Sequence, residues 1–437
     1  MDKTLLLDPV RILRGIGQSV EQGAVLVEEG ILTAFNGDAR QKAKALGLSP
    51  TEAPEQLVAP CLVDPHSVLE TPFSGDQETI ESLRRCAASA GYGQVALLPR
   101  GRTWRDQPEC LQGFSKDPKN GVQLHLWGGF SQGGTSERLA PHGDLLEHGA
   151  IGLADDDALI SPQLLEQGLV LGEMGSCPIL VALRDPALQG AGMVREGVET
   201  LRAGWPPDPL SSEMLPISQL MALHQRHRDR QLRLMNLSTA AAVEQLVAFG
   251  DHPPLSSVNW WHLLADRNGL AAGNPGWRVR PSLGGSKDRE RLIDAVLSQT
   301  ITAISVHAVS LDDEDMLLPP DQRPPGLCGH HLVLPALWDA LVRQRNTPVE
   351  RLWQALSFGP SALIDQPPEE LRLGSRRWLL FDPNHQWTVR RDDPQAPRGA
   401  NMPFLGQVMT GRVIACGLNR QGGQCEPEAR SGTPPAQ

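Results

Sequence analysis

The chain has 437 residues, of which 40% are hydrophobic and 21% charged, and no run of about 18 apolar residues marks a membrane span. It carries a net charge of −11 without a dense cluster of Lys and Arg, which argues against a protein that binds nucleic acid phosphates. The seven cysteines are scattered and contain no C-x-x-C pair, so neither a disulfide framework nor a thiolate zinc site is indicated.

Short apolar segments separated by turn residues occupy both ends of the chain. The clearest are residues 30–35 and residues 378–382. We predict that residues 1–58 and 365–418 together form one small composite β domain. Residues 419–437 carry repeated Gly and Pro with almost no apolar side chain, which predicts a disordered tail. The N-terminal sequence has no basic region followed by a long apolar stretch, so we expect no signal peptide and a cytoplasmic protein.

Between the two ends, short apolar strands alternate with amphipathic helical stretches. The clearest strands are predicted at residues 94–98, 123–127, 179–183, 232–236 and 301–305, and the helices at residues 76–89, 215–227, 240–249 and 287–298. Strands joined in this way lie parallel and connect through right-handed crossovers. We predict that residues 59–364 form this α/β unit. Periodicity alone does not separate a closed barrel from an open sheet.

The segment Leu62-Val63-Asp64-Pro65-His66 resembles the end of the first barrel strand in the dihydroorotases of the amidohydrolase superfamily. Later segments resemble the same family in the same order. Residues 149–157 resemble the end of its third strand, Leu237-Ser238-Thr239 the segment after its sixth, and Pro403-Phe404-Leu405-Gly406 its closing segment. The resemblance implies an α/β fold: a (β/α)8 TIM-like barrel of the metal-dependent hydrolase type, with a small composite β domain from both chain ends.

Members of this family hydrolyse or close a cyclic amide with one or two zinc ions, which make a hydroxide nucleophile near neutral pH. The resemblance implies that His66 is a retained metal position. It also implies that Val68 stands where a second histidine belongs, and Glu70 where a substrate-binding arginine belongs. Valine has no lone pair for a metal, and glutamate repels a substrate carboxylate.

Other strand ends depart from the family in the same way. Arg233 and Asn236 stand where the sixth strand should carry histidines, and Val306 occupies the position of the general acid/base aspartate of the eighth. We therefore expect no catalytic residue. Asp155, or its neighbour Asp156, fits a bridging carboxylate, so Asp155 joins the retained histidine as a predicted remnant metal position. A solvated loop is the plainer interpretation of three consecutive aspartates.

The losses fall at functional positions while the packing motifs around them persist, which indicates a scaffold that is still folded. Our leading hypothesis is a dihydroorotase-like protein related to pyrimidine biosynthesis that is catalytically inactive, needs no cofactor and acts as a structural or regulatory partner. The resemblance implies aspartate transcarbamoylase as that partner, in a homo- or hetero-oligomer.

Two alternatives stay open. One is an active zinc-dependent dihydroorotase, or a related cyclic amidohydrolase, whose altered site draws on the surviving histidines and acids near the strand ends. These are His66, Asp64, Asp155 and His307. The other is a small-molecule sensor, in which three arginines make the old substrate pocket cationic and anion-binding. These are Arg100, Arg233 and Arg280.

Overall fold

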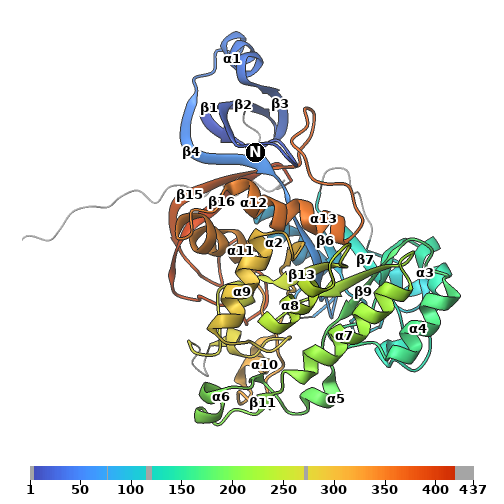
Figure 1. Ribbon diagram of the computed structural model, residues 1–437. Helices are drawn as coiled ribbons and strands as arrows, with labels where there is room; N and C mark the ends of the chain where they lie inside the picture. The colour runs from blue at the N-terminus through green and yellow to red at the C-terminus, as the bar shows by residue number, and fades with distance from the viewer. Residues whose placement is uncertain (1–3, 76, 115–120, 270–273, 419–437) are drawn as a thin grey trace, which may run out of the picture.

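The computed structural model describes residues 4–75, 77–114, 121–269 and 274–418. In these ranges the chain forms a barrel of parallel strands and a separate mixed sheet (Figure 1). No helix among them is long and apolar enough to cross a membrane. The tail predicted at residues 419–437 lies outside the described residues.

Eight strands form the barrel, and their order around it follows the chain. They are β5 (Leu62–Ser67), β6 (Tyr92–Leu97), β7 (Gln123–Gly129), β8 (Ala150–Ala154), β9 (Pro178–Ala182), β12 (Gln231–Met235), β13 (Leu255–Asn259) and β14 (Ala303–Ser305). Each neighbouring pair is parallel. The predicted (β/α)8 barrel is therefore confirmed, with β14 returning almost onto β5.

β13 has no counterpart among the strands predicted from the sequence, because only two of its five side chains, Leu255 and Val258, are apolar. β8 lies next to β7 and is the fourth strand of the barrel. The expectation that residues 149–157 end the third strand is wrong, since β7 already occupies that place. Asp155 and Asp156 therefore follow the fourth strand.

Side chains from alternate strand positions fill the inside of the barrel. The buried interior set includes Val63, Ala96, Trp127, Leu180 and Met235. Outward-facing side chains of the same strands pack under the helices, so the strands carry near-continuous apolar runs. The indole N–H of Trp127 donates to the carbonyl oxygen of Pro65 at 3.1 Å, which fixes this large ring inside the barrel.

Helices cover the barrel on the outside (Figure 1). The longer ones are α2 (Ile80–Ser89), α4 (Pro162–Leu171), α7 (Ser211–Arg226), α8 (Ala240–Ala248), α9 (Ser286–Leu297) and α11 (His330–Leu337), which runs on into η6 (Trp338–Arg343). The shorter ones are η1 (Pro108–Leu111), η3 (Gln132–Gly134), α3 (His142–Glu147), α5 (Pro186–Gln189), η4 (Trp260–Leu263), η5 (Pro275–Trp277), α10 (Asp313–Leu317), α12 (Val349–Trp353), η7 (Gln354–Phe358) and α13 (Gly359–Leu363).

The four helices predicted from the sequence are present, and polar caps decide where two of them begin. α2 begins after Thr79, whose hydroxyl accepts from the Ser82 N–H at 3.4 Å. The prediction that residues 77–79 belong to this helix is therefore wrong. α8 begins after Thr239, whose hydroxyl accepts from the Ala242 N–H at 3.2 Å.

Both ends of the chain contribute to one six-stranded mixed sheet, as predicted for the fold class. Its order is β16-β15-β4-β1-β2-β3, with β1 (Leu5–Ile12), β2 (Glu21–Glu28), β3 (Ile31–Phe35), β4 (Thr51–Pro60), β15 (Trp378–Thr388) and β16 (Val408–Cys416). β1 and β4 are parallel, and the other neighbours are antiparallel. Helix α1 (Asn36–Ala45) packs on this sheet.

Side chains complete the seam between the first and last barrel strands. The Val306 N–H donates to Asp64 Oδ1 at 3.0 Å, and the Ala308 N–H donates to Ser67 Oγ at 2.7 Å. The Val68 N–H also donates to the Ala308 carbonyl oxygen at 2.8 Å. In a regular ladder these backbone N–H groups would donate to carbonyl oxygens of the neighbouring strand. Here the side chains of Asp64 and Ser67 accept from them instead and hold the end of β14 against β5.

We expect Asp64→Ala to lower the free energy of unfolding by about 3 kcal/mol, because several buried donors lose a charged acceptor. Chemical denaturation measures the change. Asp251→Ala removes an exposed aspartate and is the control, with an expected change within about 0.5 kcal/mol. An Asp64→Ala variant as stable as the wild type would contradict the role of this carboxylate in the seam.

Candidate functional site

His66 lies at the carboxyl end of β5, where the sequence predicts a metal position. The side chain is fully buried. Its Nδ1 atom lies 3.0 Å from Nδ1 of His307, and its Nε2 atom lies 2.8 Å from Oγ of Ser257. One of the two facing Nδ1 atoms must carry the proton of their hydrogen bond. Both ring nitrogens of His66 therefore already have partners within the protein.

Burial keeps both histidines neutral. It lowers the pKa of His66 well below the usual value, and the proximity of His307 adds to this effect. Burial also lowers the pKa of His307 to about 4. Two neutral imidazoles bonded to each other form a stable polar pair inside the barrel mouth.

The carboxylate of Asp64 lies beside this pair and is equally engaged. Its Oδ1 atom accepts from the Val306 N–H, and its Oδ2 atom accepts from the hydroxyl of Ser67. The Nε2 atom of His330, on α11, lies 3.0 Å from the same Oδ2 atom. Asp64 therefore links two strands of the barrel to one of the outer helices.

Sequence reasoning missed two serines, Ser257 and Ser305, that connect the other strand ends to His66. Ser257 of β13 accepts from the Asn236 N–H at 3.0 Å, and Ser305 of β14 donates to Asn236 Oδ1 at 2.8 Å. Asn236 and His307 both adopt left-handed backbone conformations, with φ of 55° and 46°. The sequence does show serines within strand segments, which is a signal for buried polar contacts. It does not show which residues of the other strands they contact.

Asp155, the second predicted metal position, is bound elsewhere. Its Oδ1 atom accepts from the Ser131 N–H at 2.9 Å, and its Oδ2 atom accepts from the Ser131 hydroxyl at 2.6 Å. Burial raises its pKa to about 6, although the bonds to Ser131 oppose this shift. The structure joins His66 to His307 rather than to Asp155.

Arg100 follows β6 at the barrel mouth and pairs with two acids. Its guanidinium lies 3.1 Å from Glu70 and 3.3 Å from Asp156. Burial raises the pKa of Asp156 well above its ordinary value, and the negative charge of Asp157 raises it further, while Arg100 opposes both effects. The positive charge of Arg100 is thus already paired with acids of the protein itself.

Asp157 is the partner of two more arginines. Arg184 Nη2 lies 2.7 Å from Asp157 Oδ1, and Arg280 Nη1 lies 3.2 Å from Asp157 Oδ2. Burial alone would raise the pKa of Asp157, but the charges of these arginines outweigh burial and lower it. Arg280 is therefore held at the mouth by an ionised carboxylate.

Arg233 does not join the other two arginines that the sensor hypothesis groups with it. It lies in the middle of β12, opposite Leu180 of β9, and its side chain bonds to Gln231 toward the start of the strand. The position is two residues, or about 7 Å, below the strand end. Arg100 and Arg280 lie in the loops after the strands, so the three guanidinium groups do not form one cationic pocket.

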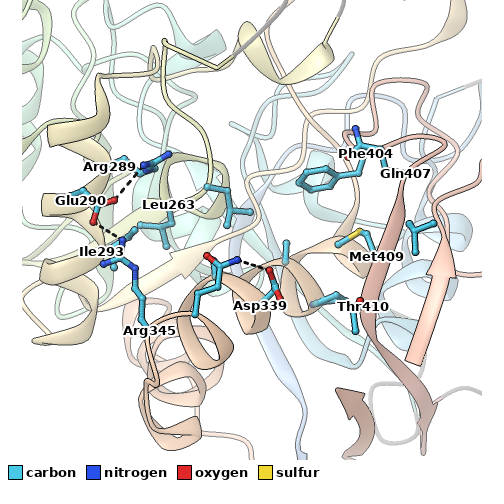
Figure 2. A pocket seen from close by; sticks show the side chains of 16 residues that line it. Leu263, Arg289, Glu290, Ile293, Asp339, Arg345, Phe404, Gln407, Met409 and Thr410 are labelled. Atoms are coloured by element: carbon cyan, nitrogen blue, oxygen red, sulfur yellow. Dashed lines mark hydrogen bonds and ion pairs between the residues drawn. The ribbon is translucent and has the colours of Figure 1, made fainter. Parts of the chain in front are cut away.

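A groove of about 480 Å³ lies on the outside of the barrel, between α9, η6 and the start of β16 (Figure 2). Ile293 and Phe404 belong to its apolar lining, and Glu290 forms ion pairs with Arg289 and Arg345 along one side. None of the site residues predicted from the sequence lines this groove. It is separate from the barrel mouth.

We expect His307→Gln to reduce the dependence of stability on pH. The folded-state pKa of about 4 lies below the unfolded value of 6.5, so stability present above pH 6.5 is lost as the pH falls toward 4. Between pH 7 and pH 5 the variant should lose about 2 kcal/mol less unfolding free energy than the wild type, as measured by urea denaturation. His148→Gln, at an exposed site, is the control. Equal pH dependence in wild type and His307→Gln would contradict the buried neutral pair.

Comparison with solved structures supports the fold. The L-hydantoinase (dihydropyrimidinase) of Arthrobacter aurescens superimposes with a TM-score of 0.74 at 16% sequence identity, over 94% of this chain and 93% of that structure. The D-hydantoinase of a Thermus species gives the same TM-score, identity and coverage. At this identity the likeness shows the barrel and its accompanying sheet.

Comparison of sequences extends this result to the family. No protein-family model matches the chain. The dihydroorotase of Thermus aquaticus is 25% identical over 424 residues, covering 93% of this chain and 96% of that protein. A protein of Synechocystis described as a probable dihydroorotase-like protein is 33% identical over 392 residues, covering 82% of this chain and 87% of the relative. The chain belongs to the dihydroorotase-like family of the cyclic amidohydrolase superfamily.

Proposed function

We propose that this protein does not hydrolyse a cyclic amide and acts instead as a structural or regulatory partner in pyrimidine biosynthesis. The observation that carries the proposal is the set of hydrogen bonds at the barrel mouth. Both ring nitrogens of His66 and both carboxylate oxygens of Asp64 are bonded to other protein groups. Polar atoms engaged in this way stabilise one fold, and both side chains are fully buried, so neither is exposed to a substrate.

The residues present do not fit a catalytic zinc site. Such a site takes three protein ligands and leaves one position for water. His66 and His307 supply two imidazoles, but their Nδ1 atoms are bonded to each other. Across the described ranges, no group of three or more His, Cys, Asp or Glu side chains is arranged to hold a metal ion.

The groups that would move a proton and bind substrate are replaced as well. By the family resemblance Val306 stands at the acid/base position, and its buried, apolar side chain cannot accept a proton. Glu70 stands at the position of a substrate-binding arginine and forms an ion pair with Arg100. A substrate carboxylate would therefore have to displace this ion pair before it could reach the guanidinium of Arg100.

The family resemblance supplies the partner in this proposal, which is aspartate transcarbamoylase in a hetero-oligomer. The retained fold supports it, because a barrel kept for its outer surface needs its strands, helices and turns but not its metal ligands. In this role the protein requires no cofactor.

An active zinc-dependent dihydroorotase, or a related cyclic amidohydrolase, is the second candidate function. One observation favours it: the dihydroorotase of Thermus aquaticus matches this chain over nearly the whole length of both proteins. The two functions differ in zinc content and in turnover, so a single preparation can separate them.

We expect the purified full-length protein, equilibrated with excess zinc and then desalted, to retain far less than one zinc per chain and to show no turnover of dihydroorotate. His66→Ala should change neither value, because both ring nitrogens are already engaged. His142→Ala removes another buried histidine and is the matched control. Zinc near one ion per chain that is lost in His66→Ala but kept in His142→Ala would establish the hydrolase instead.

We expect the full-length protein and aspartate transcarbamoylase from the same organism to co-elute in size-exclusion chromatography. Affinity capture from cell extract, with metal analysis of the same preparation, should yield that enzyme without stoichiometric zinc. Most specific complexes have a Kd below about 10 µM. Separate elution of the two purified proteins at about 10 µM each would therefore rule out this partner.

A further inference from the structure

Two loop excursions meet beside the barrel. The first follows β9 and forms a small parallel pair, β10 (Val194–Arg195) and β11 (Pro207–Asp208), joined by α6 (Val198–Arg202). The second follows β13, and its described parts are residues 260–269 and 274–285. The Arg195 N–H donates to the carbonyl oxygen of Leu283 at 3.1 Å, which ties the two excursions together.

A cavity of about 200 Å³ lies between these excursions. The first contributes Val194, Thr200 and Trp205 to its lining, and the second contributes Arg267, Trp277 and Leu283. The indole rings of Trp205 and Trp277 stack with centroids 4.5 Å apart and planes 28° from parallel. Because the two rings face each other, each covers one face of the other, and Trp277 is only 3% exposed.

Arg267 is held in place as the cationic part of the lining. Its Nη1 atom donates to the Glu196 carbonyl oxygen at 2.9 Å, and its Nε atom lies 3.3 Å from Glu199. The guanidinium also lies against Gly197, where an added Cβ would come within 2.4 Å of Cζ. Its Nη2 atom lies beside two glycines, since an added Cβ would come within 2.5 Å of it at Gly197 and within 3.2 Å at Gly285. Glu199 also lines the cavity, so a bound carboxylate would share the guanidinium with Glu199.

The indole N–H of Trp277 is a donor without an acceptor among the described residues. The atom is also buried. A buried donor left unpaired costs about 1–3 kcal/mol, which an acceptor on a bound molecule would recover.

We propose that this cavity binds a small planar aromatic carboxylate. The ring packs beside the stacked pair of Trp205 and Trp277, both of which border the cavity, and the carboxylate pairs with Arg267. The volume equals that of about six or seven waters at ~30 Å³ each, which admits a single ring. The proposal concerns loops outside the strand ends and does not depend on whether the barrel mouth is catalytic.

Isothermal titration of the full-length protein with benzoate tests the site. We expect saturable binding with a Kd of about 1 mM or lower, as suits a ligand of this size. Benzamide lacks the charge and cyclohexanecarboxylate lacks the planar ring, so both should bind at least about tenfold more weakly. Absence of saturable benzoate binding up to about 20 mM, or equal binding of all three compounds, would overturn the proposal.

Variants separate a direct role from a structural one. Arg267→Gln should abolish benzoate binding, and Trp277→Phe should weaken it at least threefold. Glu199→Gln removes the same ion pair as Arg267→Gln but keeps the guanidinium, so it should retain binding. Trp104→Phe removes another buried indole N–H that has no acceptor among the described residues, and it is the control that should not change binding. Equal loss in Glu199→Gln and Arg267→Gln, or full binding in Arg267→Gln, would overturn the proposed contact.

Discussion

The carboxylate of Asp64 is the constraint on which the barrel depends, because the last strand must return to the first one to close it. β14 has only three residues, so a regular ladder cannot hold it against β5. Asp64 accepts from the Val306 N–H on one side of the seam and contacts His330 of α11 on the other. A residue of the family signature therefore stabilises the closed barrel directly.

This closure determines what the mouth of the barrel offers to a ligand. His66 is bonded to His307 and Ser257, and the acids after the strands pair with arginines. Buried ions and hydrogen bonds of this kind are expensive to break one at a time, because the partner left behind stays desolvated. The polar groups of the mouth thus hold each other, and an incoming metal or anion would have to displace them.

The ligand site that we propose lies in the loops around the barrel. The excursions after β9 and β13 form their own small core around Trp277, and they enclose a cavity with one charged corner at Arg267. Loops carried by a rigid barrel tolerate change more readily than the strands, because few buried contacts depend on them.

Much of the architecture is predictable from the sequence, because it depends on local pattern. Apolar runs mark most of the barrel strands, and Thr239 precedes the helix predicted at residues 240–249, whose first turn it caps. The helix predicted at residues 76–89 begins later than predicted, because Thr79 caps it at Ile80. The polar strand β13 is missed, since a strand with serines inside it has no clear apolar pattern. β8 is apolar, and the number predicted for it is wrong because it comes from the family resemblance rather than from the order of the strands.

The sequence by itself determined the fold class, the order of the family motifs and the residue types at each strand end. Only the tertiary structure decided which of these side chains meet: His66 with His307, Asp155 with Ser131, and Arg100 with Glu70 and Asp156. The reason is that strand position is set by neighbours in the chain, whereas contacts across the mouth depend on the register of eight strands and on how the barrel closes.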